Sequence, residues 1–498
     1  TVTSLWLFAR GLRTGKWWLH LLAALSYALA VLSKEHAVLA PLAALPVYIV
    51  VSRPSRTRLA MVAGVTTALI GAAAAILWVR FGYIIGTPFD EYSRAYIAQL
   101  AALDPDAPRR AWPLSIINQC WLFFEYGVRW FFPVANWMSI SMRPPFPVTW
   151  LSWPQVLGVP MYLAVIAMGL RLVVAHRDWR AIVGLSLLLP AILFGTEFVT
   201  VWVQDPFVLY RSYLWAIGVP GLVFVFVYGT SLRALAVVGT IAGLLLAWQA
   251  IERVISFSSP ETAWSDAIAK LSKDPRAVGR WFPYLNRGSY YADRDQLELA
   301  LRDFETSATL GDLGMGAFNA GSMLNAMGKP QQALTMFDRA QNQGYDLYSL
   351  PFQRGLAFEA AGNAAEAYRQ FDAATAMHPP SPTREILMLQ RGRAALQTGQ
   401  RDVAIGDLDA YLKIYPRHGE ARYLLAMAYS AKGEYARALE EIDALGPTPG
   451  GPAHYARAVA NYGLGRKADA TREIEAAIRL DPRNALLRDW QAKIRASP

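Results

Sequence analysis

A repeating pattern of alanine, glycine and large apolar residues dominates the second half of the chain. From Trp281 onward an alanine recurs with a period near 34 residues, and a large apolar residue follows it four positions later. A glycine stands five positions before each alanine except the first, where Asp295 takes its place. The recurring pairs are Ala300/Phe304, Ala333/Phe337, Ala367/Phe371, Ala404/Leu408, Ala438/Ile442 and Ala470/Ile474. A period of this length predicts stacked helical hairpins.

The spacing inside each unit is that of the tetratricopeptide repeat (TPR). The small alanine lets two antiparallel helices approach, the glycine permits the turn, and the large apolar residue fills the groove of the next unit. We expect a linker with a half repeat over residues 256–280, six TPR units over 281–483, and a capping helix over 484–498. That helix should cover the apolar end of the array with Leu486, Leu487 and Trp490.

An array of this kind predicts a binding surface. Its repeats stack into a superhelix whose concave face holds peptides or proteins. Ser, His and Asp residues occur in the array without the spacing of a nucleophile elbow or a catalytic triad. Recognition of a protein or peptide acceptor is one interpretation, and a scaffold for homo- or hetero-oligomerisation is the other.

The first half of the chain, residues 1–255, is built from long apolar runs. The runs predict an all-α protein in which a polytopic membrane helix bundle precedes the TPR α-solenoid. The candidate spans are Trp17–Leu32, Ala37–Val51, Leu59–Val79, Val156–Val174, Ala181–Val203, Ser212–Tyr228 and Ala234–Ile251. The aromatic-rich run over 114–134 carries Asn118, Gln119, Glu125 and Arg129 and favours an interfacial or re-entrant segment.

Charge divides the chain in the same way. Residues 1–256 hold 19 Lys and Arg against 10 Asp and Glu, and the remainder holds 29 against 28. A neutral array argues against nucleic acid as a partner. The short basic loops lie around residues 10–16, 53–58, 176–180 and 233, and the positive-inside rule places them in the cytoplasm. The array then lies on the extracytoplasmic side. If 114–134 crosses the membrane, everything after it changes sides.

Polar residues gather on the predicted outer face. Lys34, Glu35 and His36 stand between two apolar runs, and Tyr210 and Arg211 precede another. The other polar groups predicted on this face are Asp90, Glu91, Arg94, Glu197 and Asp205. Ionisable groups at membrane depth are costly and usually functional. Cations at the mouth of an apolar cavity suit a lipid with a phosphorylated head group, because Lys supplies a point charge and Arg a bidentate fork.

Structural roles compete with this interpretation. Lys34 and Glu35 also suit the cap of a tight helical hairpin in which they neutralise each other. Arg211 also suits a snorkelling position at the interface. The pair Asp90 and Glu91 favours a solvated loop, and the many tryptophans between 112 and 153 favour an interfacial belt.

Cysteine and histidine add no chemistry to the prediction. Cys120 is the single cysteine, so no disulfide within the chain is possible. The six histidines have no metal-ligand spacing, and no cofactor is evident; a divalent metal stays an open question.

Three short segments carry a resemblance to a known family. They are Leu-Ser-Lys-Glu at residues 32–35, Tyr-Arg-Ser-Tyr-Leu at 210–214, and the aromatic run 121–133 followed by Asn136 and Trp137. With the trailing array they resemble membrane O-mannosyltransferase-like proteins with TPRs, of the GT-C superfamily. Arg211 falls where that family's Glu-Arg-Tyr-Leu-Tyr-Leu-Pro motif has its Arg. Tyr210 replaces its Glu, and Ala216 replaces its Pro.

The resemblance implies an integral-membrane glycosyltransferase that uses a polyprenyl-phosphate-linked sugar as donor. It assigns Lys34, Glu35, His36, Tyr210 and Arg211 to the lipid phosphate. The superfamily's catalytic acidic residue lies in the first outer loop, and no Asp or Glu precedes Glu35. We therefore expect an N-terminally truncated enzyme of the bacterial inner membrane, with the array in the periplasm. The alternative is a non-enzymatic, membrane-anchored TPR scaffold for cell-envelope assembly.

Overall fold

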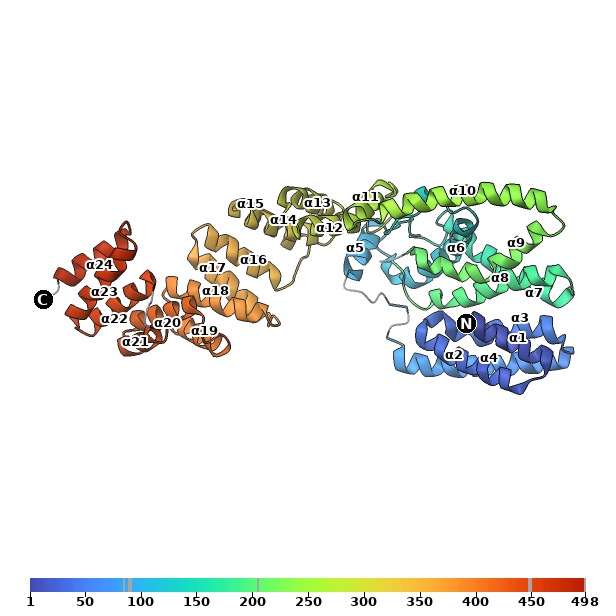
Figure 1. Ribbon diagram of the computed structural model, residues 1–498, viewed down its shortest axis with the longest axis horizontal. Helices are drawn as coiled ribbons and strands as arrows, with labels where there is room; N and C mark the ends of the chain where they lie inside the picture. The colour runs from blue at the N-terminus through green and yellow to red at the C-terminus, as the bar shows by residue number, and fades with distance from the viewer. Residues whose placement is uncertain (84–85, 88–91, 204–205, 447–449, 497–498) are drawn as a thin grey trace. The chain divides into compact units, whose positions relative to one another are not determined.

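The computed structural model divides into two compact units, and it describes residues 1–83, 86–87, 92–203, 206–446 and 450–496. Unit 1 comprises Thr1–Gln296 with Thr306–Leu313, and unit 2 comprises Leu297–Glu305 with Gly314–Pro498. Both are helical, and the described part of the chain contains no β-strand (Figure 1). The all-α prediction is confirmed.

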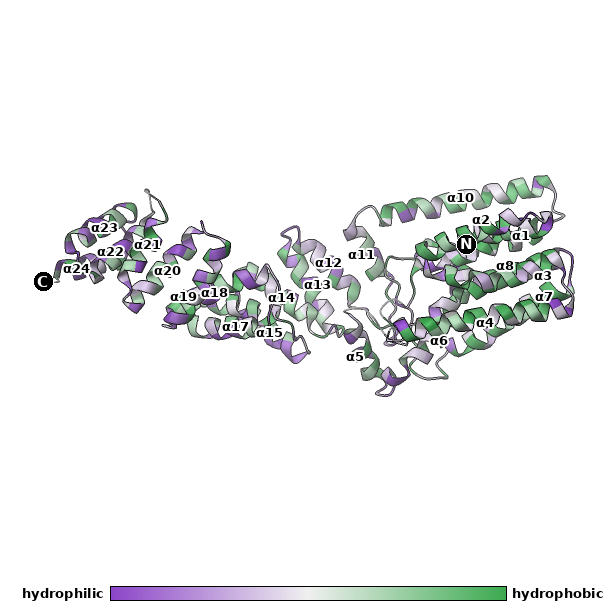
Figure 2. Cartoon of the chain, turned by 90° about the horizontal axis from the view of Figure 1, so that it is seen from below, coloured by the Kyte–Doolittle hydropathy of each residue, from purple (hydrophilic) through white to green (hydrophobic). Residues whose placement is uncertain are grey.

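Unit 1 consists mainly of apolar helices (Figure 2). Its helices are α1 (Val2–Thr14), α2 (Trp17–Ser33), η1 (Glu35–Leu39), α3 (Ala40–Ser52), α4 (Arg56–Phe81), α5 (Ser93–Leu103), η2 (Pro108–Arg110), α6 (Ala111–Phe131), η3 (Ala135–Trp137), η4 (Gln155–Leu157), α7 (Gly158–Ala175), α8 (Trp179–Phe194), η5 (Gly195–Phe198), η6 (Leu209–Ile217), α9 (Val219–Val227), α10 (Leu232–Ser256), α11 (Pro260–Ala269) and α12 (Phe282–Ala292). Among the described residues, four helices are long and apolar enough to cross a membrane, or five if one bent pair counts as a span.

Two predicted spans differ in detail from the observed helices. The run Ser212–Tyr228 is not one straight helix, because η6 and α9 meet at an angle of 52°. The run Ala181–Val203 ends as an α-helix at Phe194 and continues as the short 3₁₀ helix η5. Both breaks lie beside the polar residues of the predicted outer face. The run over 114–134 forms α6, which does not meet the criteria for a membrane span.

An aromatic cluster forms the centre of unit 1. The Phe123 ring of α6 lies 4.7 Å from the Trp215 ring, 5.1 Å from Tyr162 and 5.3 Å from Phe194, measured between centroids. Edge-to-face and tilted contacts at these distances are favourable beyond the area that they bury. Gly218 lets η6 approach α8, since a Cβ there would lie 2.1 Å from the Ser186 carbonyl oxygen. The cluster thus fixes η6 against α6 and α8.

The segment that leads into the array is anchored within unit 1. Trp281 is fully buried, and its ring stacks on Tyr96 of α5 at 5.2 Å. Arg143 donates from Nη2 to the Tyr96 hydroxyl at 3.2 Å and lies over the Phe282 ring. The Gly279 amide donates to the Gln99 side chain at 2.7 Å. These contacts join the chain after α11 to α5 and to the loop before α7.

Unit 2 is an array of antiparallel helix pairs. The pairs are α14 (Met315–Ala326) with α15 (Pro330–Asn342), α16 (Ser349–Ala360) with α17 (Ala364–Ala376), α18 (Thr383–Gln397) with α19 (Arg401–Ile414), α20 (Gly419–Lys432) with α21 (Tyr435–Asp443), and α22 (Gly451–Gly463) with α23 (Lys467–Leu480). The first half of α13 (Leu297–Thr309) and the last helix α24 (Ala485–Ala496) complete the unit.

The repeat positions behave as the periodicity predicts. All six recurring alanines are fully buried, and the large apolar residues that follow them are at most 2% exposed. The turn glycines adopt positive φ, from 69° at Gly328 to 88° at Gly433. Asp295, in the first repeat, adopts φ 58° although a side chain disfavours that region. The prediction of a TPR array is confirmed.

Glycines in the first helix of three repeats provide a contact that the prediction omits. A Cβ at Gly321 would lie 2.5 Å from the Phe337 ring, and one at Gly355 would lie 2.4 Å from the Phe371 ring. Each ring therefore packs between the two helices of its own repeat. Phe371 also belongs to one buried cluster with Leu387 of the next repeat, as expected for a groove-filling residue.

Ion pairs recur between successive repeats. An Arg in the first helix of a repeat pairs with an Asp in the second helix of the preceding repeat: Arg354–Asp338 at 2.8 Å, Arg391–Asp372 at 2.8 Å and Arg457–Asp443 at 3.0 Å. Arg391 also binds Asp407 with two nitrogens, at 2.7 and 2.8 Å, and these hydrogen bonds raise its pKa. The pairs between repeats favour a single register of stacking, and the bidentate Arg391–Asp407 pair joins the two helices of one repeat.

The capping helix differs from the prediction at one position. Leu487 and Ile494 of α24 are buried, and Trp490 packs edge-on against Tyr455 and Tyr462. Leu486 is instead half exposed, because its neighbour Leu487 shares a face with Ile494, seven residues on. Leu487 and Trp490 therefore pack as predicted, and Leu486 does not.

Candidate functional site

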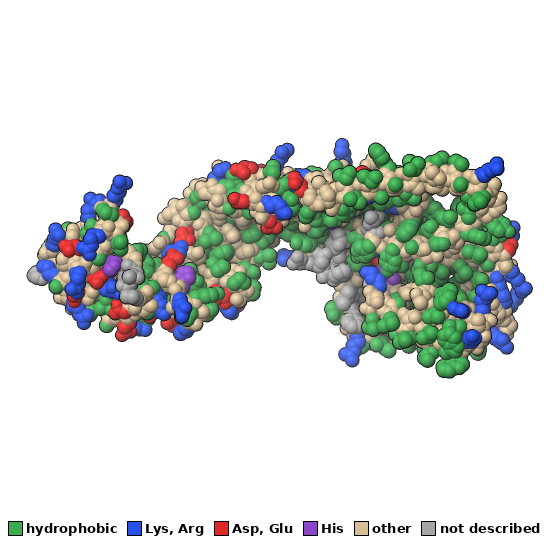
Figure 3. Space-filling model, in the orientation of Figure 1, with side chains coloured by type: hydrophobic (Ala, Val, Ile, Leu, Met, Phe, Trp, Pro, Cys, Tyr) green, Lys and Arg blue, Asp and Glu red, His purple; other side chains and the backbone are tan. Residues whose placement is uncertain are grey.

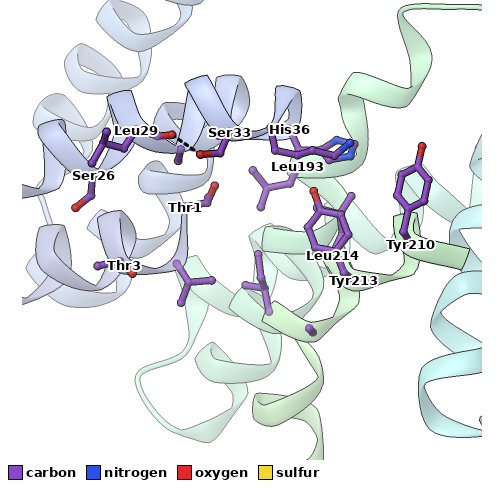
Figure 4. A pocket seen from close by; sticks show the side chains of 16 residues that line it. Thr1, Thr3, Ser26, Leu29, Ser33, His36, Leu193, Tyr210, Tyr213 and Leu214 are labelled. Carbon is purple, nitrogen blue, oxygen red and sulfur yellow. Dashed lines mark hydrogen bonds between the residues drawn. The ribbon is translucent and has the colours of Figure 1, made fainter.

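A cavity of about 880 Å³ lies in unit 1 between α1, α2, η1 and η6. Figure 4 shows His36, Tyr210 and Tyr213 grouped at one side of it and Thr1, Thr3 and Ser26 at the other. Its apolar wall consists of Val2, Leu29, Ala30, Ala37, Leu193, Leu214, Ala216 and Ile217. An apolar hollow with a few convergent polar groups is typical of a ligand site.

The polar side of the cavity contains one cation next to an aromatic ring. The Lys34 ammonium lies 5.1 Å from the centre of the Tyr210 ring, and the Tyr210 side chain is 58% exposed. The Ser33 hydroxyl, which also lines the cavity, donates to the Leu29 carbonyl at 2.8 Å. The α2 helix ends at Ser33 and the next residue, Lys34, is extended, which directs the chain into η1. The helix end therefore positions the ammonium at the cavity.

Behind this wall lies a buried acidic residue, Glu197 of η5. One carboxylate oxygen is 3.4 Å from Nε2 of His36, and the other is 3.0 Å from Nε of Arg211. All three side chains are at most 3% exposed. Nδ1 of His36 also makes a hydrogen bond with the Thr196 hydroxyl. The break between α8 and α9 thus places one carboxylate between two basic groups.

Arg211 is held by aromatic rings as well as by Glu197. Its guanidinium lies 3.6 Å from the centre of the Trp202 ring and 6.0 Å from that of Tyr210. Both faces of a guanidinium can stack on π-systems, and Arg suits such buried sites better than Lys. Arg211 is 1% exposed and does not line the cavity, so it supports the wall that carries Tyr210.

The structure brings most of the predicted donor-binding residues together. Lys34, His36 and Tyr210 line one cavity, and Arg211 lies directly behind it. Glu35 belongs to η1, but its side chain lies outside the described residues, as do Asp90, Glu91 and Asp205. Lys34 and Arg211 both lie within about 6 Å of the Tyr210 ring centre. They are therefore neighbours of one ring.

Three contributors had no role in the prediction. Thr196, Trp202 and Tyr213 contact His36 or Arg211, and Glu197 had been noted only as one of the outer polar groups. A sequence signal for Glu197 existed, because it is the only carboxylate between Asp178 and Asp205. The 3₁₀ geometry that directs it inward was not apparent from hydropathy.

Over the described part of the chain, no three His, Cys, Asp or Glu residues are placed to hold a metal ion.

A second hollow lies in the array, between α15, the loop that follows it, α16 and α17. It encloses about 620 Å³. Leu347 and Met377 line it and are 52% and 46% exposed, so two large apolar side chains meet at one hollow. Tyr345, Leu350, Pro351 and Ala373 extend the apolar lining, and burial raises the pKa of Tyr345.

Helix pairs of this geometry are typical of tetratricopeptide repeats, and a family model matches part of the array. The tetratricopeptide repeat family matches residues 389–452. One similar solved structure is the TPR protein YrrB, which is 19% identical over 42% of this chain and 96% of that chain, with a TM-score of 0.33. Another is Pseudomonas aeruginosa pilF, which is 15% identical over 43% of this chain and 97% of that chain, with a TM-score of 0.35. PilW, a type IV pilus biogenesis factor, is 17% identical over 43% of this chain and 99% of that chain, also with a TM-score of 0.35. No curated protein sequence matches the chain. The chain contains tetratricopeptide repeats.

Proposed function

We propose that the protein is a membrane-anchored TPR scaffold whose array binds a polypeptide partner. The hollow lined by Leu347 and Met377 carries the proposal, because it brings two exposed large apolar side chains together in one concave site of the array. Burying such side chains against a partner gains about 25 cal/mol for each Å² removed from water. An apolar side chain of a protein segment is the occupant that this hollow fits.

The anchor in this proposal is unit 1. Helices α4 and α10 are apolar along their length and bury none of their described residues in the protein, as expected of helices that face lipid. The basic hairpin loops support a cytoplasmic position for their end of the bundle. The array then lies on the extracytoplasmic side, which is the periplasm for a bacterial inner-membrane protein. The same proposal includes a membrane domain that ends at residue 255, a linker that ends at 280 and a repeat array that ends at 483.

A photo-crosslinking experiment tests the scaffold. A photoreactive residue at position 347 of the full chain, in its native membrane, should give one discrete protein adduct. The same residue at Leu464, exposed elsewhere on the array, should give none. The substitution Met377→Glu should reduce the adduct at least about fivefold, because it places a charge in an apolar contact. Equal labelling at both positions would contradict a specific surface.

The cavity at Lys34 supports a second candidate, a glycosyltransferase-like function with a lipid-linked sugar. Its apolar wall suits a polyprenyl chain, and the ammonium beside Tyr210 suits a phosphate. Behind this wall, His36 and Arg211 flank the buried carboxylate of Glu197. In this proposal the sugar would pass from polyprenyl phosphate to an acceptor that the array presents, and Lys34 would bind the phosphate.

Lys34→Gln should therefore lower the affinity of the full chain for a polyprenyl phosphate. The loss of one charge-assisted contact predicts about tenfold weaker binding, measured by native mass spectrometry from detergent. Lys329→Gln, which neutralises an exposed lysine of the array, is the matched control and should leave the affinity unchanged. Equal affinity in both variants would remove the lipid-phosphate site and leave the scaffold proposal standing.

A further inference from the structure

The four hairpin loops at one end of unit 1 are unusually rich in cations. Space-filling shows Lys and Arg side chains gathered at this end (Figure 3). The nine cations are Arg10, Arg13, Lys16, Arg53, Arg56, Arg58, Arg177, Arg180 and Arg233. All but Arg53 are exposed. The carboxylate in these loops is Asp178, which caps α8 by accepting from the Arg180 amide.

The charges at this end are not neutralised inside the protein. Within the described ranges none of the nine cations makes an ion pair. Two cations elsewhere in unit 1 show the contrast, because Arg110 lies 2.9 Å from Asp104 and Arg129 lies 3.1 Å from Glu125. Like charges that crowd together favour the binding of anions, and the gain is largest at low salt.

Aromatic rings stand beside several of these cations. Arg10 lies over the Trp6 ring at 5.2 Å and Arg180 over the Trp179 ring at 5.6 Å, and both tryptophans are exposed. Lys16 lies over the Trp18 ring at 5.9 Å. Tryptophan prefers the head-group level of a bilayer, where its ring is half in apolar surroundings. The cations are therefore held at the level of lipid head groups.

The helices on either side of the basic loops indicate which kind of anion binds there. Each basic loop joins helices with exposed apolar side chains, including Leu21 and Leu25 on α2 and Leu244 and Leu245 on α10. A soluble polyanion would satisfy the charges but leave these surfaces uncovered. An anionic phospholipid satisfies both, because its phosphate meets the cations and its acyl chains cover the apolar flanks.

We infer that this basic end is a binding surface for anionic phospholipids. The inference rests on the membrane anchoring that the proposed function includes. Arg53 has a structural part in the surface, because its Nη1 donates to the Val173 carbonyl at 3.0 Å and so joins the α3–α4 loop to the end of α7. The exposed cations Arg56, Arg58, Arg177 and Arg180 then carry the lipid contacts.

The test measures lipid-dependent thermal stability of the full chain in a neutral detergent. Added phosphatidylglycerol should raise the unfolding midpoint, and phosphatidylcholine should not. Because four surface cations that attract anionic lipid are lost, R56Q/R58Q/R177Q/R180Q should raise the phosphatidylglycerol concentration for half-maximal stabilisation at least about tenfold. The control R466Q/K467Q/R483Q/R488Q removes four exposed cations of unit 2 and should keep the wild-type response.

Three outcomes would overturn the inference. They are equal stabilisation by both lipids, an equal effect of soluble glycerophosphoglycerol, and an unchanged response of the four-site loop variant. A separate arm reconstitutes the chain into phosphatidylcholine vesicles and extracts them with alkaline carbonate. Loss of the protein from those vesicles would contradict the anchor itself. Retention without a preference for phosphatidylglycerol would contradict only the lipid-binding surface.

Discussion

Replacing Phe371 by alanine is expected to lower the free energy of unfolding of the array by about 3–5 kcal/mol. The ring is fully buried and packs on Gly355 of its own repeat, so its removal leaves a cavity between the two helices. It also contributes to the cluster with Leu387 and Ala394 of the next repeat. Because each repeat contacts only its neighbours, one cavity weakens the junction and the array on both sides of it.

Urea unfolding of the full chain in detergent, followed by helical circular dichroism, measures this loss. The control is Met377→Ala, six residues further along the chain, where the side chain is 46% exposed and the expected loss is below about 1 kcal/mol. Gly355→Ala should also destabilise, since its Cβ would lie 2.4 Å from the ring. Combining it with Phe371→Leu should restore part of that loss. Equal effects of Phe371→Ala and Met377→Ala would contradict the packing described.

The array was predictable because its physics is local and repeated. Position 367 needs a small side chain so that two helices can approach, and position 362 needs a positive φ for the turn. Each requirement recurs once per repeat in the sequence. The expectation of a glycine at each turn has an exception at Asp295, which adopts φ 58° although it is not a glycine. The Gly355–Phe371 contact was also within reach, since Gly321, Gly355 and Gly392 recur twelve positions before the alanine.

The sequence predicts which segments of residues 1–255 are apolar, but it does not predict where their helices bend. Hydropathy identifies the run Ser212–Tyr228, yet it cannot show the 52° bend at Gly218. That bend depends on the close approach of Gly218 to the Ser186 carbonyl, a contact between segments 32 residues apart in the chain. Helix α6 is similar. Its polar residues Asn118 and Gln119 are buried inside the protein, which hydropathy alone does not reveal.

The candidate site was predictable in its residue types and not in its geometry. Lys34 and Tyr210 were selected for charge and position, and they lie beside each other at the cavity. Arg211 was expected to contact a ligand phosphate, and instead it is buried against Glu197 and Trp202. Burial depends on how η5 and η6 pack, which no local pattern encodes. The predicted pair of cations therefore divides into one cavity residue and one supporting residue.

Replacing Glu197 by glutamine is expected to destabilise unit 1 by about 3–5 kcal/mol, because it leaves the buried Arg211 without its charged partner. The thermal midpoint of the full chain in detergent, read from the monodisperse fraction after heating, measures the loss. The matched control is Glu125→Gln. Glu125 pairs with Arg129 at 3.1 Å but is partly exposed, so the expected loss is below about 1 kcal/mol.

The double variant Glu197→Met/Arg211→Met separates pairing from packing. If the ion pair mainly satisfies its own burial, replacing both partners by apolar side chains should recover most of the stability that Glu197→Gln loses. A double variant as unstable as the single one would contradict this account and assign the loss to the fit around Trp202. The result also decides how Arg211 variants are interpreted. If Arg211→Ala destabilises the wall that carries Tyr210, weaker lipid binding in that variant says nothing of a phosphate contact, whereas Lys34→Gln addresses the cavity directly.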